Sequence, residues 1–260
     1  LMKLFVVSDI HGFFDIFIEA LHEAGFVENN PDHLLICCGD YTDRGEQPFE
    51  VIEYLKTLQN VVLVRGNHED LVMECLDRRR ALQHDIHNGT VDTINKLSIS
   101  LGVSSSKSST IDGVKEYLTS FYACMRDYFE TKHYIFVHGW IPLNVFSDLP
   151  AWYTKGRTYE YNPDWRDSTT DEWNAARWFN GIDMAHKGFV EPGKTIVCGH
   201  WHCSYGHYID DKDFKIGEFD KTAIWEPYRS EGIIAIDRCT AYTQQCNILT
   251  LEDDVLTRNT

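Results

Sequence analysis

Five short apolar runs in this chain are each followed at once by residues that can bind a metal ion or a phosphate. The fragments after the runs are residues 8–12 (SDIHG), 39–45 (GDYTDRG), 65–69 (RGNHE), 137–139 (VHG) and 199–202 (GHWH). Continuous apolar runs of this length are typical of strands that are covered on both faces. Open α/β sheets bind ligands beyond the carboxyl ends of their strands. We therefore expect an α/β fold that brings the five fragments together.

Residues 1–70 alternate between predicted strands and predicted helices. The strands lie at residues 4–7, 34–38 and 61–64, and the spacing of apolar residues predicts one helix at 13–24 and another that begins at Pro48. Strands that alternate with helices are typical of a largely parallel sheet with helices packed against it. The sequence therefore predicts such a sheet at the start of the chain.

This alternation is interrupted from about residue 69 to 127. Helical stretches there flank a serine-rich polar segment at residues 98–110, which we interpret as a surface excursion or a cap beside the sheet edge. Strands return at residues 134–137, 195–198, 232–236 and 247–251, and the last two are expected to pair with each other in antiparallel fashion. The chain has no repeat, linker or shift in composition, so we expect a single domain over residues 1–260.

The charge of the chain argues against one class of partner. The formal net charge is −16 and the pI is about 5.1, whereas binding to a nucleic-acid backbone needs a basic surface. No apolar run approaches the roughly 20 residues that span a bilayer. The first residues also lack the features of a signal peptide. We expect a protein that binds neither nucleic-acid backbones nor membranes.

The eight cysteines indicate a reducing environment. None of them forms a C-x-x-C pair, and Cys37, Cys38 and Cys198 lie within apolar runs that are typical of strands. Buried thiols of this kind fit a cytoplasmic protein better than a disulfide-bonded one. We therefore expect free cysteines and a cytoplasmic location.

The polar fragments together supply a mixed set of oxygen and imidazole ligands. The candidates are Asp9, His11, Asp40, Asn67, His138 and His200. Asp9 and His11 stand two residues apart at a strand end, where both can face one cation, and the two oxygens of Asp40 can bridge two cations. His68 lies beside a ligand and stays free for proton transfer. These residue types describe a site for two divalent metal ions, which is typical of phosphate-ester hydrolysis.

Two of the fragments are long enough to identify a family. Residues 39–45 match GD-x-x-DRG and residues 65–69 match RGNHE completely. With these motifs the chain resembles the calcineurin-like metallophosphoesterases, and within them the phosphoprotein phosphatase branch of bacterial or phage type. The resemblance is close over residues 3–70 and resumes near 134–139, 196–202 and 232–251, which leaves 71–130 and 141–194 as insertions. It implies a two-sheet α/β/β/α sandwich with a dimetal site at the carboxyl ends of the strands.

The resemblance also implies a role for each matched residue. The first metal would be held by Asp9, His11 and Asp40, and the second by the bridging Asp40, Asn67, His138 and His200. A hydroxide that bridges the two ions, which are Mn²⁺ or else iron or zinc, would attack phosphorus in line. His68 would protonate the leaving oxygen, and Asp43 would orient its ring. Arg44 and Arg65 would bind the phosphate oxygens.

The sequence departs from the usual pattern of the family at three places. The family uses a further phosphate-binding arginine between the two late histidines, for which Arg177 is the first candidate and Arg166 the alternative. Trp140 stands where a second glycine is usual, and its ring would shape the leaving-group side of the site. His202 matches a histidine that ligates the first metal in other branches of the superfamily, so it is a further candidate ligand.

Aromatic residues are frequent in the second insertion. They include Trp152, Tyr153, Tyr159, Tyr161, Trp165, Trp173 and Trp178. Such residues either form a surface on which a base or an aromatic leaving group stacks, or pack an irregular cover over the sheet. Their spacing follows no regular pattern, so the sequence favours packing.

The function that the sequence favours is metal-dependent hydrolysis of phosphate monoesters, as in a Ser/Thr protein phosphatase. The alternative is a symmetrical diadenosine tetraphosphate hydrolase or another nucleotide phosphohydrolase, which would use the same metal core. A non-catalytic phosphate-binding protein is disfavoured because Asp40, Asp43 and His68 are all present. The expected partner is a phosphorylated protein or a small phosphate ester.

Overall fold

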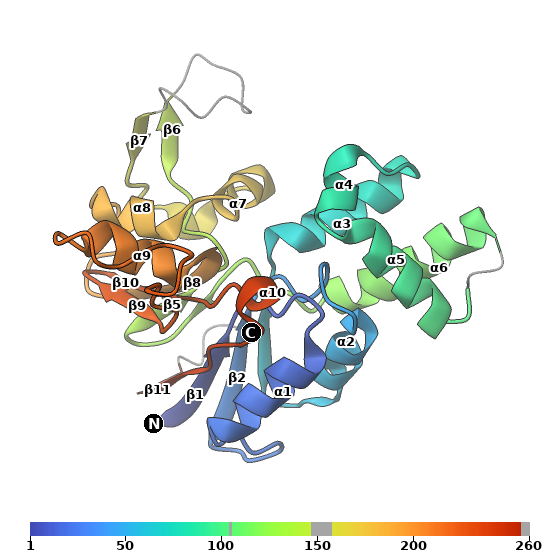
Figure 1. The fold of residues 1–260 in the computed structure, drawn as a ribbon, viewed down its shortest axis with the longest axis horizontal. Coiled ribbons are helices and arrows are strands. Elements are labelled where there is room, and N and C mark those ends of the chain that lie inside the picture. Colours follow the sequence, from blue (N-terminus) through green and yellow to red (C-terminus); the bar gives the residue numbers. More distant parts are fainter. Residues whose placement is uncertain (104–105, 147–157, 256–260) are drawn as a thin grey trace.

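A computed structural model of the chain describes residues 1–103, 106–146 and 158–255. The parallel sheet predicted for the start of the chain is present. Its strands are β1 (Met2–Val7), β2 (His33–Cys38) and β3 (Val61–Val64). The connecting helices are α1 (Phe14–Glu23) and α2 (Pro48–Thr57). Both helices cover the same face of this first sheet (Figure 1).

A second sheet has the strand order β4-β5-β8-β10-β9. Its strands are β4 (Phe129–Glu130), β5 (Tyr134–Phe136), β8 (Thr195–His202), β9 (Tyr228–Ser230) and β10 (Ile233–Asp237). β8 runs parallel to both of its neighbours, with Ile196 opposite Ile135 on one side and Ile233 on the other. The fragment VHG at the end of β5 and the fragment GHWH at the end of β8 therefore lie at one edge of this sheet.

The last strand pairs differently from the prediction. β11 (Leu249–Asp253) joins the first sheet antiparallel to β1, whereas β10 lies in the second sheet. The expected pairing of the last two strands was wrong, because β10 suits the interior of a sheet and β11 suits an edge. All residues of β10 are buried, whereas Thr250 and Glu252 of β11 are exposed, as suits a strand at a sheet edge. The chain passes from one sheet to the other by way of α10 (Thr240–Thr243).

Alternate residues of the central strands divide the core into layers. Phe5 and Val7 of β1 belong to the cluster that α1 and α2 cover, whereas Leu4 and Val6 face strands of the second sheet. Ile196 of β8 belongs to a third cluster on the outer side of the second sheet. The two sheets thus pack against each other and carry helices on their outer faces. This arrangement confirms the expected α/β/β/α sandwich.

Four helices form a lobe beside the first sheet, which we call the helical lobe (Figure 1). They are α3 (Asn67–Arg78), α4 (Gln83–His87), α5 (Thr90–Ser100) and α6 (Lys107–Tyr122). Its residues Leu97, Val114 and Leu118 are buried in the same cluster as Phe5 of β1. The helical lobe therefore extends the core of the first sheet. Among the described residues, none of the helices combines the length and apolar character that a membrane span needs.

The elements of the second insertion are the strand pair β6 (Asn144–Phe146) and β7 (Thr158–Glu160), a 3-10 turn at Trp165–Asp167, α7 (Thr170–Ala176) and α8 (Gly181–His186). Residues of α7 and α8 pack against the second sheet, whereas the strand pair β6 and β7 projects away from it (Figure 1). After β8 the chain forms α9 (Cys203–Asp210).

The aromatic residues of the second insertion serve mainly as packing. Trp165 and Trp173 are buried, and Tyr159 and Tyr161 are partly buried against the same cluster. Trp178 differs, because 51% of its surface is exposed. Trp152 and Tyr153 lie outside the described residues. The described aromatic residues of the second insertion, apart from Trp178, therefore pack in the core of the protein, as the sequence favoured.

Candidate dimetal active site

Several residues of the predicted site have left-handed backbone conformations. They are Asp9 (φ 53°), His11 (φ 49°), Asp40 (φ 59°), Asp43 (φ 69°), Arg44 (φ 67°) and His200 (φ 63°). A non-glycine residue in such a conformation costs on the order of 1–3 kcal/mol, and such residues cluster at functional sites. The turns after β1 and β2 and the end of β8 are therefore strained, and packing around them must hold them in place.

Glycines in the motifs let the polar side chains approach the backbone of neighbouring turns. A Cβ atom at Gly66 would lie 2.2 Å from Oδ1 of Asp40, and one at Gly199 would lie 2.2 Å from Oδ2 of Asp9. Both separations are far below van der Waals contact. The glycines of RGNHE and GHWH thus make room for two candidate metal ligands.

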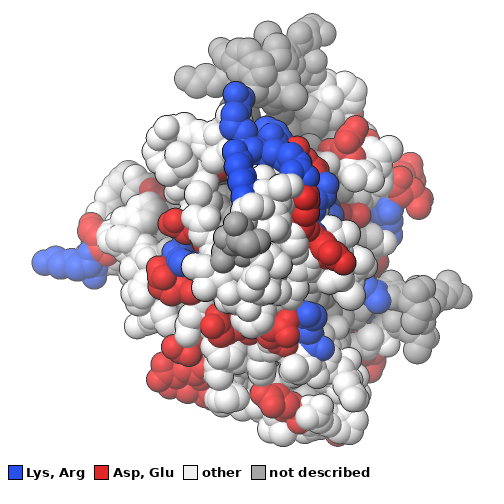
Figure 2. Space-filling model, turned by 90° about the vertical axis from the view of Figure 1, so that its right-hand side faces the viewer, with Lys and Arg blue, Asp and Glu red and all other residues white. Residues whose placement is uncertain are grey.

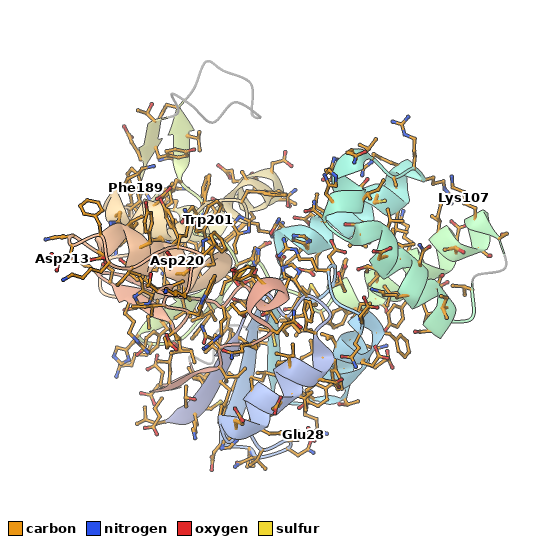
Figure 3. The ribbon with its side chains drawn as sticks, in the orientation of Figure 1. Glu28, Lys107, Phe189, Trp201, Asp213 and Asp220 are labelled. Carbon is orange, nitrogen blue, oxygen red and sulfur yellow. The ribbon has the colours of Figure 1, made fainter. Side chains whose placement is uncertain are left out.

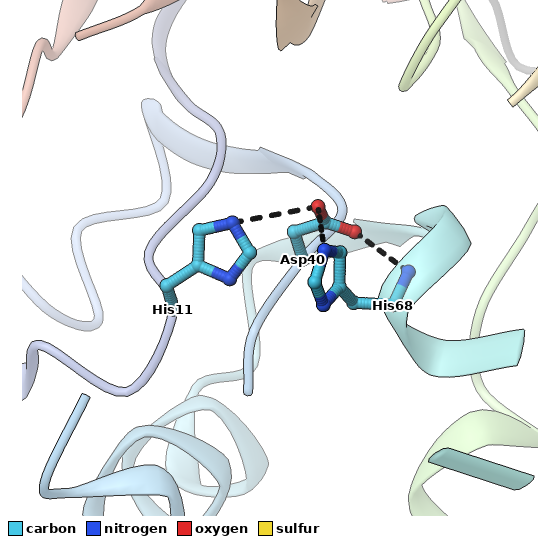
Figure 4. Close-up of side chains that lie close together, drawn as sticks. All are labelled: His11, Asp40 and His68. Carbon is cyan, nitrogen blue, oxygen red and sulfur yellow. Dashed lines mark hydrogen bonds and ion pairs between the residues drawn. The ribbon is translucent and has the colours of Figure 1, made fainter. Parts of the chain in front are cut away.

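The first candidate metal group is formed by His11, Asp40 and His68 (Figure 4). Nδ1 of His11 donates to the carbonyl oxygen of Thr42 at 2.9 Å, so that Nε2 carries the lone pair in the neutral ring. This Nε2 lies 3.5 Å from Oδ2 of Asp40 and 3.9 Å from Oδ1 of Asp9. Burial, and next the charge of Arg44, lower the pKa of His11 well below its usual range. A neutral imidazole of this kind is a metal ligand.

The second candidate group is formed by Asp40, His138 and His200, together with the amide of Asn67. Nδ1 of His138 donates to the carbonyl oxygen of Cys38 at 2.7 Å. The lone pair on Nε2 then faces two further acceptors, Oδ1 of Asn67 at 2.7 Å and Oδ1 of Asp40 at 3.4 Å. Acceptors that face one another at these distances need a proton or a cation between them.

His200 completes the second group. Its Nδ1 lies 3.1 Å from Oδ1 of Asn67, and its backbone N–H donates to Oδ2 of Asp9 at 3.0 Å. Burial, and next the neighbouring His138, lower the pKa of His200 well below its usual range. The donor atoms of this group thus fit a divalent cation with mixed oxygen and imidazole ligands.

Asp40 lies between the two groups. Its Oδ2 faces His11 and its Oδ1 faces His138, while the backbone N–H of His68 donates to Oδ1 at 3.0 Å (Figure 4). Burial raises the pKa of Asp40 well above its usual range, and the Asp9 carboxylate adds to this effect. A buried carboxylate is kept ionised by cations beside it. One oxygen toward each group is the arrangement that a bridging ligand requires.

His68 differs from the other members of the first group because its ring is hydrogen-bonded to a further carboxylate, that of Asp43. Nδ1 of His68 donates to Oδ2 of Asp43 at 2.7 Å, and both side chains are buried. Burial by itself would lower the pKa of His68, but the carboxylates of Asp40 and Asp43 outweigh it, and the pKa is raised. The hydrogen bond from Nδ1 to Asp43 leaves Nε2 as the ring atom that can transfer a proton.

Three of the four candidate arginines pair with groups in or beside the site. Nη1 of Arg44 lies 2.7 Å from Nε2 of His11, and its Nη2 lies 3.2 Å from Nε2 of His68. Arg65 and Arg177 share one carboxylate, that of Asp70 on α3. Nε of Arg65 lies 2.7 Å from Oδ1 of Asp70, and Nη1 of Arg177 donates to its Oδ2 at 2.8 Å.

Arg177 is also bound by Asp127, and 4% of its side chain is exposed. Arg166 lies elsewhere and pairs with Glu130 and Glu191 at 2.6 and 2.8 Å. Between these two candidates for the late arginine, Arg177 is therefore the one connected to the helix that carries His68.

His202 and Trp140 have other neighbours. Nε2 of His202 pairs with Oε1 of Glu218 at 2.8 Å, and the histidine belongs to neither candidate metal group among the described residues. Trp140 is buried in the outer core of the second sheet and donates to the carbonyl oxygen of Phe189 at 2.9 Å. The expectation that the Trp140 ring shapes the leaving-group side is therefore wrong, because this ring fills the core.

Two residues near the site had no role in the sequence-based prediction. Glu69 accepts hydrogen bonds from the backbone N–H groups of Asp40, Tyr41 and Gly66 at 2.9, 3.0 and 2.8 Å, and so ties the second and third motif turns together. Asp237 is buried at the end of β10, where burial and then Asp9 raise its pKa well above the usual range. A carboxylate at the end of a predicted buried strand is the signal that would have indicated Asp237.

Two exposed aromatic rings flank His200. The ring centroids of Trp178 and Trp201 lie 5.9 and 6.2 Å from that of His200. The exposed fractions of these tryptophans are 51% and 36%. Trp201 lies on the side of the molecule that the second sheet forms (Figure 3). These rings are placed where they can contact a group attached to a phosphate in the site.

Comparison with known proteins finds sequence similarity over part of the chain. Symmetrical bis(5'-nucleosyl)-tetraphosphatase of Citrobacter koseri is 36% identical over 69 residues, which are 26% of this chain and 24% of that protein. Serine/threonine-protein phosphatase 2 of Salmonella typhimurium is 35% identical over 75 residues, which are 28% of this chain and 33% of that protein. The chain therefore spans about a quarter to a third of these curated relatives.

Similarity of fold extends over nearly the whole chain. A crystal structure of a mutant cold-active protein tyrosine phosphatase is 16% identical and superposes with a TM-score of 0.55, covering 97% of this chain and 76% of that one. A family model described as calcineurin-like phosphoesterase matches residues 2–204, which include every candidate metal ligand. The chain belongs to the calcineurin-like phosphoesterase family.

Proposed function

We propose that this chain hydrolyses phosphate monoesters with the help of two divalent metal ions. The observation that carries the proposal is the position of Asp40, which directs one oxygen toward each ligand group beside the His68–Asp43 pair. The proposed ligands are Asp9, His11 and Asp40 for one ion, and Asp40, Asn67, His138 and His200 for the other. When bound, the ions supply a water of lowered pKa and neutralise charge on the phosphate. Manganese suits this ligand set, as do iron and zinc.

The side chains around the ions have separate tasks in this proposal. Nε2 of His68 donates a proton to the leaving oxygen, and Asp43 fixes the ring through Nδ1. The exposed guanidinium of Arg44 reaches the edges of both His11 and His68, so it binds phosphate oxygens placed between them. Arg65 and Arg177 are both paired with Asp70 on the helix that carries His68, and Arg177 also pairs with Asp127, so they brace that helix.

His202 remains an alternative ligand for the first ion in the sequence-based prediction. Its pairing with Glu218 supports a different role, because Nε2 is already engaged in that contact. We therefore leave it out of the proposed ligand set.

A phosphorylated serine or threonine in a protein is the first candidate substrate. The complete GD-x-x-DRG and RGNHE motifs and the similarity to a serine/threonine-protein phosphatase support it. A dinucleoside tetraphosphate is the second candidate. The similarity to a bis(5'-nucleosyl)-tetraphosphatase and the exposed rings of Trp178 and Trp201 beside His200 support this alternative, because such rings can stack on a base.

The charge of the protein favours one class of binding partner, and its free cysteines favour one kind of cellular compartment. On the face shown in Figure 2, one group of basic side chains lies near the top, and acidic side chains lie beside it and over the rest of that face. Together with the net charge of −16, this supports a phosphate ester rather than a nucleic-acid backbone as partner. All eight cysteines are free, which supports a reducing compartment such as the cytoplasm.

The test is steady-state hydrolysis of an aryl phosphate, a phosphoserine peptide and diadenosine tetraphosphate by manganese-loaded protein. Rapid turnover of the peptide with little on the dinucleotide would establish a protein phosphatase. The reverse result would establish a nucleotide hydrolase. Metal-loaded protein that leaves all three substrates intact would refute the proposed function.

A further inference from the structure

The first turn of α5 packs directly behind the His68–Asp43 pair. Oγ1 of Thr90 donates to Oδ2 of Asp43 at 2.8 Å, and this is the same oxygen that accepts from Nδ1 of His68 at 2.7 Å. Thr90 and Asp43 are both fully buried. The carboxylate of Asp43 thus receives one hydrogen bond from His68 on α3 and one from Thr90 on α5.

The same helix also holds the strained backbone of the DRG turn. The backbone N–H of Asp43 donates to Oγ1 of Thr93 at 2.9 Å, and Nζ of Lys96 donates to the carbonyl oxygen of Gly45 at 3.0 Å. A Cβ atom at Gly89 would lie 2.6 Å from the backbone nitrogen of Arg44. Helix α5 therefore bonds to Asp43 and Gly45, and Gly89, which precedes the helix, lies against Arg44.

These contacts decide how freely the carboxylate of Asp43 can turn. Its second oxygen, Oδ1, is buried and has no hydrogen-bond partner among the described residues. Only the bonds at Oδ2 then define the carboxylate plane. Removing the Thr90 hydroxyl would leave His68 as the single partner, so both side chains could rotate together.

We propose that Thr90 is a positioning residue, which holds Asp43 and through it the ring of His68 in the orientation that protonates the leaving oxygen. This inference rests on the proposed function. It gives a second helix of the helical lobe, α5, a part in the reaction beside α3, which carries Asn67 and His68 in its first turn.

The inference is tested by the dependence of rate on the leaving group. Phenyl phosphate releases a basic oxygen that needs a proton, whereas dinitrophenyl phosphate releases a stable anion that does not. In Thr90→Val we expect kcat for phenyl phosphate to fall by about 10- to 100-fold, a size typical of losing an outer partner of a site residue. We expect kcat for dinitrophenyl phosphate to change by less than about threefold, because protonation contributes little to that reaction.

Matched variants separate positioning from a general loss of structure. Thr90→Ser keeps the hydroxyl and should restore most of the phenyl phosphate activity. Thr119→Val makes the same chemical change on the exposed face of α6 and should leave both rates unchanged. Metal content and Tm are measured for each variant, and Thr90→Ala replaces Thr90→Val if the valine variant does not fold.

The measurements distinguish failure of the role of Thr90 from failure of the proposed function. Equal loss on both phosphates, or no loss on either, would overturn the positioning role of Thr90. Failure of Thr90→Ser to recover activity would also overturn it. Wild-type protein that binds two ions and hydrolyses neither phosphate would refute the proposed function itself, and the inference with it.

Discussion

The two sheets contribute to the site in different ways. Turns after the strands of the first sheet carry most of the chemical groups, and these lie within long motifs: Asp9, His11, Asp40, Asp43, Arg44, Asn67 and His68. The second sheet contributes His138 after β5 and His200 at β8, each within a short fragment. The first sheet thus supplies the proposed acid–base pair and most of the proposed ligands, and the second sheet completes one of the two proposed ion sites.

The two late histidines are also aligned by the first sheet. His138 donates to the carbonyl oxygen of Cys38 at the end of β2, and the backbone of His200 donates to Asp9 after β1. These contacts form only when the two sheets pack against each other through Leu4, Val6 and their partners. One of the proposed ion sites is therefore built mostly by turns of a single sheet, and the other depends on the packing of two sheets.

The largest expected effect comes from the residue that joins both sites. Asp40→Asn should lose both ions together, and activity should fall by more than about 10⁴-fold because the charge that holds two cations is reduced. Metal content per chain is measured by elemental analysis after dialysis. Asp32→Asn, at an exposed position, is the control and should keep two ions. Two ions retained in Asp40→Asn would refute the bridging role.

Loss of the acid should leave the metals in place. His68→Asn is expected to keep both ions and to reduce kcat by about 10²–10⁴-fold, as for the removal of a general acid. The measurement combines metal content with hydrolysis of phenyl phosphate. His87→Asn, at an exposed position on α4, should behave like wild type. Full activity in His68→Asn would exclude His68 as the proton donor.

Removing a ligand from the second sheet should distinguish the two ion sites. His138→Ala is expected to retain one ion per chain and to lower kcat by at least about 10²-fold, because the second ion loses one of its ligands. Titration with Mn²⁺ measures the number of ions bound. His22→Ala on the exposed side of α1 is the control. Loss of both ions would show that the sites are not separable in this way.

The smallest expected effect concerns the contact between the sheets. Asp253 on β11 accepts from Oγ1 of Thr131 at 2.7 Å and from the backbone and ring of His133 at 2.8 and 2.7 Å. Burial by itself would raise the pKa of Asp253, but these hydrogen bonds outweigh it, and the pKa is lowered. Asp253→Asn should therefore reduce the free energy of unfolding at neutral pH by about 1–3 kcal/mol.

The pH dependence of this effect has a definite sign. A carboxyl group whose pKa is lower in the folded state stabilises the fold above its unfolded pKa, and this contribution is lost as pH falls through the folded value. The difference between Asp253→Asn and wild type should therefore shrink as pH falls below 3.8. Urea unfolding at a series of pH values measures it. A difference that grows in acid would contradict the assigned role of Asp253.

Sequence patterns predicted the first sheet well, because β1, β2 and β3 are apolar on both faces and joined by helices with regular apolar spacing. The partner of the last strand could not be predicted in the same way. Pairing depends on which sheet edge is free, and the neighbours that decide this for β11 lie almost the whole chain away, on β1. The contacts of Thr90 could not be predicted for a similar reason, because its partner Asp43 lies 47 residues earlier in the chain. A threonine at the start of a helix indicates by itself only a possible helix cap.

The sequence by itself determined which chemical groups lie at the ends of the strands and which glycines lie beside them. The alternation of side chains along a strand and the geometry of the following turn depend on residues that are neighbours in the sequence. Only the tertiary structure decided which groups meet. It placed Arg177 and Arg65 on Asp70, paired His202 with Glu218, and set Thr90 behind Asp43. Each of these contacts joins distant segments, and their geometry depends on how the layers pack rather than on local spacing.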